Sequence, residues 1–162
     1  MAATEKELHA RLADLGIEST TVRHPAVFTV EESKALRGNL PGAHSKNLFL
    51  KDKKGTYWLV VTLEDREIDL KTLRRQIGAA QLSFARAERL KETLGVDPGS
   101  VTPFALINDT ENNVRVVLDA EMMACETLNY HPLTNTASTT ITPDGLMTFI
   151  LSCGHQPSVV EL

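Results

Sequence analysis

The segment KNLFLKDKKGTYWLVVTL, residues 46–63, contains two apolar runs joined by a charged turn. Residues 46–52 and 56–63 are rich in leucine, valine and aromatic side chains, which favour β-strands. The turn Asp52-Lys53-Lys54-Gly55 ends in a glycine, as many hairpin turns do. The segment therefore predicts a β-hairpin, and it places Lys46 and Asn47 at the start of the first strand.

The chain before the hairpin predicts a helix, a short strand and a second helical piece. Thr4 and Glu7 have the spacing of a capping box, apolar residues then recur on one helical face, and Gly16 stands where the helix should end. Residues 20–23 favour a strand. A second capping box, from Thr29 to Glu32, begins a short helical piece that is a candidate mobile lid.

The chain after the hairpin alternates between helical and strand signals. Asp69 can cap a helix that runs through Ile77, and a further helix is expected around residues 87–94. Strands are predicted at residues 104–107, 114–118, 127–130 and 137–141, and a last helix begins at Thr142-Pro143. Because several strands are linked by tight turns, the prediction is an α+β fold with a mixed, largely antiparallel sheet flanked by helices.

Length and composition are those of one globular domain, which we expect to span residues 1–162. Hydrophobic residues make up 42% and charged residues 23% of the chain, close to the ordinary globular mix. The N-terminus has no apolar signal region, and no run approaches the roughly 18 apolar residues of a membrane span. We therefore expect a soluble, cytoplasmic protein whose two cysteines, Cys125 and Cys153, are reduced packing residues.

The formal net charge of -4 argues against a general nucleic-acid binder, because phosphate binding needs local lysine and arginine. The cations are nevertheless clustered, at Lys46, Lys51, Lys53, Lys54, Lys71, Arg74, Arg75, Arg86, Arg89 and Lys91. Such clusters can bind one end of a nucleic acid without binding polyanions at large. Solvated helix faces and a charged hairpin tip explain each single cation equally well.

Lys46 and Asn47 place a cation beside a carboxamide at the mouth of an apolar strand. Together they can hold an anion and a neutral acceptor at the rim of a pocket. The competing interpretations are an exposed strand lysine and a turn-capping asparagine.

Two further candidates lie later in the chain. His131 precedes a proline, which restricts its backbone, and its ring titrates near neutral pH. It suits proton transfer, but a structural or substrate-positioning role is favoured, because no acidic residue near it in sequence can orient the ring. The loop Gly99-Ser100-Val101-Thr102-Pro103 combines a glycine, which permits positive φ and close approach of a ligand, with a stiffening proline. A plain turn before a strand is the alternative.

No side chain stands out as a nucleophile. The cysteines lack a histidine-and-acid context, and no Gly-x-Ser-x-Gly motif occurs. His9, His24, His44 and His155 lack metal-ligand spacing. We therefore predict a site without metal or cofactor, in which water is the attacking group.

The Lys46-Asn47 pair, the Gly99 to Pro103 loop and the segment around His131 occur in an order that resembles the YbaK-like editing-domain family, which hydrolyses mischarged prolyl-tRNAs. The closest likeness is to the freestanding alanyl-tRNA(Pro) deacylases, and it covers nearly the whole chain. The resemblance implies a tRNA deacylase in which Lys46, Asn47 and His131 are catalytic and the loop binds substrate. The implied partner is the acceptor end of tRNA(Pro) carrying a wrong amino acid, with prolyl-tRNA synthetase as a further candidate and no membrane.

The same resemblance gives a physical reason for the enzyme. A synthetase pocket built for proline rejects the smaller alanine only weakly, since each missing methylene is worth about 1–3 kcal/mol. A second pocket too narrow for proline would destroy the alanyl ester and spare the correct product, and the ribose hydroxyl beside the ester is expected to help activate water. Candidate walls are Val22, Phe28 and Val30, for each of which core packing is the default interpretation.

Two alternatives remain open from the sequence. The substrate can instead be a tRNA charged with cysteine, serine or threonine, because pocket volume and one or two hydroxyl partners decide the choice. The chain can also be a non-catalytic tRNA-binding module, which the basic clusters and the missing nucleophile favour and the acidic total disfavours.

Overall fold

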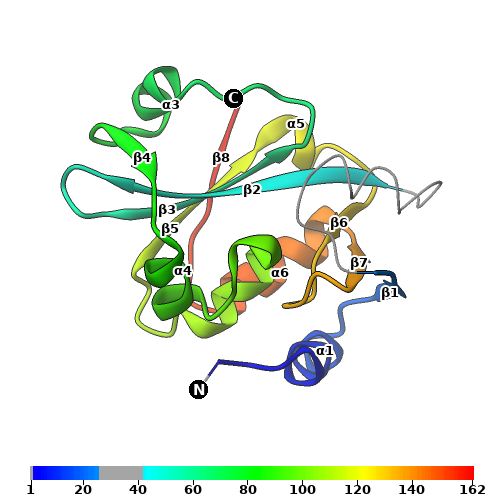
Figure 1. Ribbon diagram of the computed structural model, residues 1–162. Helices are drawn as coiled ribbons and strands as arrows, with labels where there is room; N and C mark the ends of the chain where they lie inside the picture. The colour runs from blue at the N-terminus through cyan, green and yellow to red at the C-terminus, as the bar shows by residue number, and fades with distance from the viewer. Residues whose placement is uncertain (1, 26–41) are drawn as a thin grey trace.

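The computed structural model describes residues 2–25 and 42–162, which form a mixed β-sheet with helices on both of its faces (Figure 1). The strands are β1 (Ser19–Arg23), β2 (Ala43–Asp52), β3 (Tyr57–Leu63), β4 (Leu82–Phe84), β5 (Val114–Asp119), β6 (Leu128–Tyr130), β7 (Ala137–Ile141) and β8 (Ser158–Val160). The helices are α1 (Glu5–Asp14), α3 (Leu70–Ile77), α4 (Ala87–Leu94), α5 (Ala120–Met123) and α6 (Pro143–Ser152), with 3-10 helices η1 (Pro98–Ser100) and η2 (Pro103–Asn108).

The strand order is β1-β7-β6-β2-β3-β5-β8, and β4 pairs with β2 beside this path. The pairs β1–β7, β6–β7, β2–β3 and β2–β4 are antiparallel. The pairs β2–β6, β3–β5 and β5–β8 are parallel. The predicted mixed, largely antiparallel sheet flanked by helices is confirmed.

Strand periodicity divides the sheet into two faces. Phe49, Leu59 and Val61 point to the face that carries the larger core cluster, together with residues of α1, α4 and α6; we call this the inner face. Leu50 and Val60 point to the opposite, outer face, where a smaller cluster includes residues of α3. In Figure 1, α3 accordingly lies above the sheet and α1, α4 and α6 below it.

Local signals in the sequence locate most helix ends correctly. The Thr4 hydroxyl accepts from the Glu7 backbone N–H at 3.2 Å, and the Glu7 carboxylate accepts from the Thr4 N–H, so the predicted capping box is present. Asp69 caps α3, which ends at Gly78 with φ of 72°. These hydrogen bonds satisfy backbone groups that a helix end leaves unpaired.

Other elements differ from the prediction or cannot be compared with it. Residues 104–107 form part of the 3-10 helix η2, and the three-residue strands β4 and β8 are additional to the predicted ones. The proposed lid from Thr29, and the pocket candidates Phe28 and Val30, lie outside the described residues. Among the residues described, no helix is long and apolar enough to cross a membrane.

Candidate active site

A gap in strand pairing lies along one edge of β2, at the position of the Lys-Asn pair. On one side β2 pairs continuously with β3, from Ser45 to Lys51. On its other side β2 pairs with β6 only at Ala43 and His44, and with β4 only from Leu50 onward. In the part of the chain that the structure describes, the edge between these two pairings has no strand partner, so Lys46 and Asn47 sit where backbone and side chains can be approached.

The parallel register of β2 and β6 brings Lys46 toward His131. Ala43 lies opposite Leu128, and His44 lies opposite Asn129. Continuing this register places Ser45 beside Tyr130 and Lys46 beside His131. The hydroxyls of Ser45 and Tyr130 support the continuation, because both lie at Met122 Sδ, at 3.4 and 3.2 Å. Lys46 and His131 therefore belong to neighbouring positions on the outer face.

The His131 ring is held by a backbone carbonyl. Its Nδ1 lies 2.9 Å from the carbonyl oxygen of Ala137, so Nδ1 carries the proton and donates it. Burial lowers the pKa of His131, and the nearby His24 ring lowers it further, whereas the bond to Ala137 opposes the shift. The imidazole is therefore neutral at pH 7, and the lone pair of its Nε2 can accept a proton or a hydrogen bond.

His24 and Val22 extend the outer face across to β1. The His24 ring lies 6.1 Å from the His131 ring, and its Nε2 lies 3.0 Å from the Ser138 hydroxyl. Val22 pairs with Ser138 and is 42% exposed. Since residues paired across antiparallel strands share a face, Val22 lies near the two histidines with its side chain accessible to a ligand.

Asn47 projects from the opposite face of β2. It pairs with Val61, whose side chain is in the inner core, and consecutive strand residues point to opposite sides. Its Oδ1 is buried and has no hydrogen-bond partner among the described residues. The Lys46 side chain therefore lies on the outer face of the sheet and the Asn47 side chain on the inner face. A ligand can reach both only at the gap in the pairing of the β2 edge.

The Gly99 to Pro103 loop approaches from the inner side. Gly99 and Ser100 lie in η1, where φ of Gly99 is not positive, so a left-handed backbone is not the reason for glycine here. Val101 packs against the inner core, and Thr102, fully buried, accepts from the Phe104 N–H at 3.3 Å. The Pro103 side chain is buried as well.

The loop connects to the strand of His131 through aromatic packing. The Phe104 ring, just after Pro103, meets the Tyr130 ring edge-on with centroids 6.0 Å apart. Tyr130 is buried beneath His131, and burial raises the pKa of its hydroxyl. Tyr130 and His24 were both missed by sequence reasoning. Adjacency to His131 could have pointed to Tyr130, and His24 precedes a proline as His131 does, which is the signal that could have pointed to it.

Chemically, the outer face can bind an anion and handle a proton. Lys46 is half-buried and forms no ion pair with a carboxylate of the described residues, so its charge is available to a ligand. The neutral His131 ring beside it can accept a hydrogen bond from a hydroxyl, an ammonium group or water. This combination suits an ester that lies next to a phosphate.

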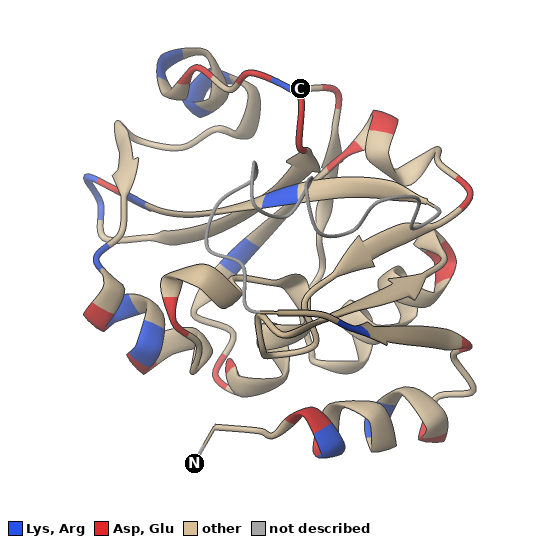
Figure 2. Ribbon diagram, turned by 45° about the vertical axis from the view of Figure 1, so that its right-hand side comes forward, with Lys and Arg blue, Asp and Glu red and all other residues tan. Residues whose placement is uncertain are grey.

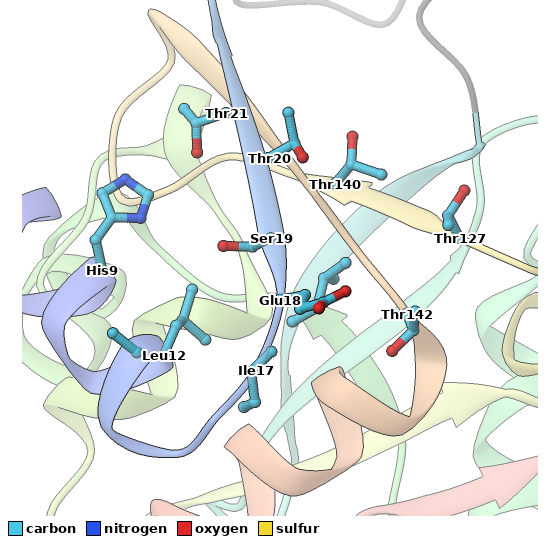
Figure 3. A pocket seen from close by; sticks show the side chains of 12 residues that line it. His9, Leu12, Ile17, Glu18, Ser19, Thr20, Thr21, Thr127, Thr140 and Thr142 are labelled. Carbon is cyan, nitrogen blue, oxygen red and sulfur yellow. The ribbon is translucent and has the colours of Figure 1, made fainter.

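A hollow of about 820 Å³ lies elsewhere, between α1, β1 and β7 (Figure 3). Half of its twelve lining residues carry hydroxyl groups, namely Ser19, Thr20, Thr21, Thr127, Thr140 and Thr142. No lysine or arginine is among its described lining residues, while Glu18 is, and His9 is bound to Glu5. A phosphate would meet repulsion there, so this hollow suits the substrate less well than the outer face around Lys46 and His131.

Comparison with known sequences defines the class of the protein. The sequence model of the aminoacyl-tRNA editing domain matches residues 24–149, more than half of the chain and all of the candidate site except Val22. The chain belongs to this family, and it is therefore an enzyme, an aminoacyl-tRNA deacylase that hydrolyses a carboxylic ester.

Individual relatives are similar over nearly their full lengths. The chain is 44% identical over 159 residues to a prolyl-tRNA synthetase associated domain-containing protein 1 of Bos taurus, covering 95% of this chain and 92% of the relative. It is 36% identical over 154 residues to the prolyl-tRNA editing protein ProX of Acetoanaerobium sticklandii, covering 94% of each. A crystal structure of a candidate trans-editing enzyme for prolyl-tRNA synthetase superposes with a TM-score of 0.74 at 21% identity over 100% of this chain and 99% of the other, which supports the fold.

Proposed function

We propose that this protein corrects errors of prolyl-tRNA synthetase in trans, by hydrolysing the ester of alanine attached to tRNA(Pro). Membership of the editing-domain family and the 36% identity to a prolyl-tRNA editing protein support trans-editing of tRNA(Pro). The observation that supports the choice of site is the β2–β6 register at Ala43 and His44, which, when continued, brings Lys46 and the neutral His131 imidazole to one face. The whole chain, residues 1–162, acts as one domain in the cytoplasm, where charged tRNA is used.

In the proposed complex, Lys46 binds the phosphate that precedes the terminal adenosine. Its charge is not offset by a carboxylate of the described residues, so the attraction is directed to the substrate. The ester then lies over the gap in the β2 edge, with His131 Nε2 within reach of the ribose or of the amino group of alanine.

The chemical step is attack of water on the ester carbonyl carbon. The bond between that carbon and the ribose oxygen breaks, the water oxygen stays on the alanine carboxyl group, and a proton passes to the ribose oxygen. The neighbouring ribose hydroxyl and His131 Nε2 orient the water and carry the proton. Asn47 and backbone amides of the Gly99 to Pro103 loop stabilise the developing negative charge from the inner side of the gap.

Selection against proline is steric in this proposal. Val22, which is exposed beside the two histidines, is one wall of the proposed pocket. To act as proposed, this pocket must admit a methyl group and exclude a pyrrolidine ring. A pocket of this kind gains its selectivity from exclusion of the larger side chain rather than from a polar contact.

The experiment incubates the protein with tRNA(Pro) charged with alanine, cysteine, serine or proline, alongside Lys46→Ala. We expect hydrolysis of the alanyl ester alone, and little hydrolysis by the variant. Faster hydrolysis of the cysteinyl or seryl ester would assign the other substrates, and tight binding without hydrolysis would make the protein a binding module. A 2′-deoxy terminal adenosine should abolish turnover, and unchanged hydrolysis would exclude the role of the ribose hydroxyl.

A further inference from the structure

Phe84 is a large aromatic side chain left in solvent. It is 65% exposed, although its strand neighbour Leu82 is buried. Phe84 pairs with Leu50 of β2, so its ring projects from the outer face, the face of Lys46. Leu50 and Lys46 are four residues apart on β2, which at 3.3 Å per residue is about 13 Å.

The segment around Phe84 is basic, in contrast to the acidic chain. Residues 70–86 contain Lys71, Arg74, Arg75 and Arg86 and neither aspartate nor glutamate, while the whole chain has a net charge of -4. Lys53 and Lys54 of the β2–β3 turn adjoin this segment, because the Lys53 N–H donates to the Gln81 carbonyl at 3.1 Å. We call these six side chains the basic ridge.

The cations of the basic ridge differ in their ion pairing from those of the neighbouring helix, within the part of the chain that the structure describes. None of them forms an ion pair with a carboxylate of the described residues. On the neighbouring helix α4, by comparison, Arg89 binds Glu92 at 2.9 Å and Lys91 lies 3.7 Å from Asp97. In Figure 2, blue and red are mixed on α4, whereas the β2–β3 turn is mostly blue with one red segment.

The surface beside α3 is also concave. A hollow of about 570 Å³ is lined by Lys71, Arg74, Arg75 and Gln81, with Leu70 and Leu82 among its apolar lining residues. Asp69 lines it too, but its carboxylate accepts from the Lys71 N–H and the Thr72 hydroxyl as the cap of α3. A cation-lined hollow next to an exposed aromatic ring combines the two features by which proteins bind single-stranded nucleic acid, a positive groove for the backbone and a platform for a base.

We propose that Phe84 stacks on an unpaired base of the tRNA 3′ end, and that the basic ridge binds the phosphates of the acceptor stem beyond it. The inference rests on the proposed function, because Lys46 is taken to hold the terminal phosphate. The length of about 13 Å along β2 from Lys46 to Leu50, the strand partner of Phe84, is spanned by a few stacked nucleotides at about 3.4 Å each. The tRNA then enters over α3 and runs along the outer face to the gap in the β2 edge.

The surrounding charge favours RNA over a second copy of the chain. In a symmetric dimer through Phe84, the basic ridge of one copy would approach the basic ridge of the other, and like charges repel. A polyanion meets no such penalty. Binding of RNA is also consistent with the absence of aspartate and glutamate from residues 70–86, since a carboxylate there would repel phosphates.

The test measures binding of uncharged tRNA(Pro) by fluorescence anisotropy. Phe84→Ala should weaken binding by about 5- to 150-fold, the effect of one base–aromatic stack. Phe84→Trp should retain wild-type affinity. The matched control is Leu151→Ala on α6, which removes another exposed apolar side chain, 50% exposed, and should leave the affinity unchanged.

A second pair of variants tests the basic ridge. The double change Arg74→Gln with Arg75→Gln should reduce the slope of log affinity against log salt by about 0.9 for each phosphate that the ridge no longer binds. The control Arg89→Gln removes a cation that is already paired with Glu92, so its slope should match the wild type. An unchanged slope in the double variant would overturn the role of the ridge.

Uncharged tRNA separates this inference from the proposed function. If the protein hydrolyses alanyl-tRNA(Pro) but Phe84→Ala binds like the wild type, the inference is wrong and the function stands. If binding depends on Phe84 but no ester is cleaved, the inference stands and the function fails. If Phe84→Ala changes the sedimentation coefficient and not the RNA affinity, the ring belongs to an interface between copies and the inference is overturned.

Discussion

Removal of the Lys46 charge should abolish most catalysis while leaving the fold intact. A lysine and a phosphate about 4 Å apart attract each other by about 1 kcal/mol in water and about 4 kcal/mol near a protein surface. Lys46 is half-buried and forms no ion pair with the described residues, so we expect the larger value to apply. For Lys46→Ala this corresponds to a fall in kcat/KM of roughly 900-fold.

Stability should hardly change, because the Lys46 amino group makes no ion pair with the described residues that the substitution could break. The side chain stands opposite Thr62, whose own hydroxyl is bound to Asp119 at 2.6 Å. We expect a change in unfolding free energy of about 0.5 kcal/mol or less, or about 1–2 °C in Tm.

The assay measures deacylation of alanyl-tRNA(Pro) under single-turnover conditions, together with thermal unfolding followed by circular dichroism. Lys46→Arg keeps the charge and should retain much of the activity, while Lys6→Ala, on the exposed side of α1, should behave as wild type. A fall in activity smaller than about threefold would contradict a phosphate contact, since even a solvent-exposed pair is worth more. A large drop in Tm would instead make Lys46 a structural residue.

Three further variants test the neighbourhood of the site and the core. Because burial lowers the pKa of His131, deacylation should fall with acid only below the ordinary histidine value of about 6.5, and the rate profile of His131→Ala should lack this acid limb. Asn47→Val removes a buried oxygen without a partner among the described residues, so urea unfolding should show a gain of about 1 kcal/mol while deacylation slows. Asp109→Ala leaves the His155 ring and the backbone N–H groups of Asn113 and Val114 without their acceptor, and should lower the unfolding free energy at pH 7 by about 1–3 kcal/mol for each buried group left unsatisfied. Burial opposes ionisation of Asp109, but hydrogen bonds from His155 and two backbone amides lower its pKa overall, so this stabilisation is complete above about pH 3.9 and disappears as the pH falls below the folded value. Unfolding curves of the variant and the wild type should therefore converge in acid, and parallel curves would contradict a stabilising role of the ionised Asp109 carboxylate.

The helix ends were predictable because their signals are local. The capping box of Thr4 and Glu7 and the cap at Asp69 involve residues within three positions of each other. The hairpin from β2 to β3 was predictable for the same reason, since its turn and both apolar runs are contiguous. The strands β4 and β8, with three residues each, are too short to show a period of two, and their pairing partners are distant in sequence.

The candidate site was predictable in its members and not in its arrangement. Strand alternation places Lys46 and Asn47 on opposite faces of β2, although their adjacency in sequence suggested one shared rim. The orienting partner of His131 is the backbone carbonyl of Ala137, which has no side-chain signature. The position of His24 near His131 depends on the β1–β7 pairing, which joins the first and last parts of the chain.

Among the described residues, two residue pairs between β2 and β6 join the strands β1, β7 and β6 to the rest of the sheet. They connect segments far apart in sequence, so the loop-closure entropy of joining them is large and they should form late in folding. Lys46 and His131 lie on opposite sides of this junction, while Trp58, the sole tryptophan, belongs wholly to the larger part. A chain refolding from urea should therefore bury its indole first and recover hydrolytic competence only afterwards.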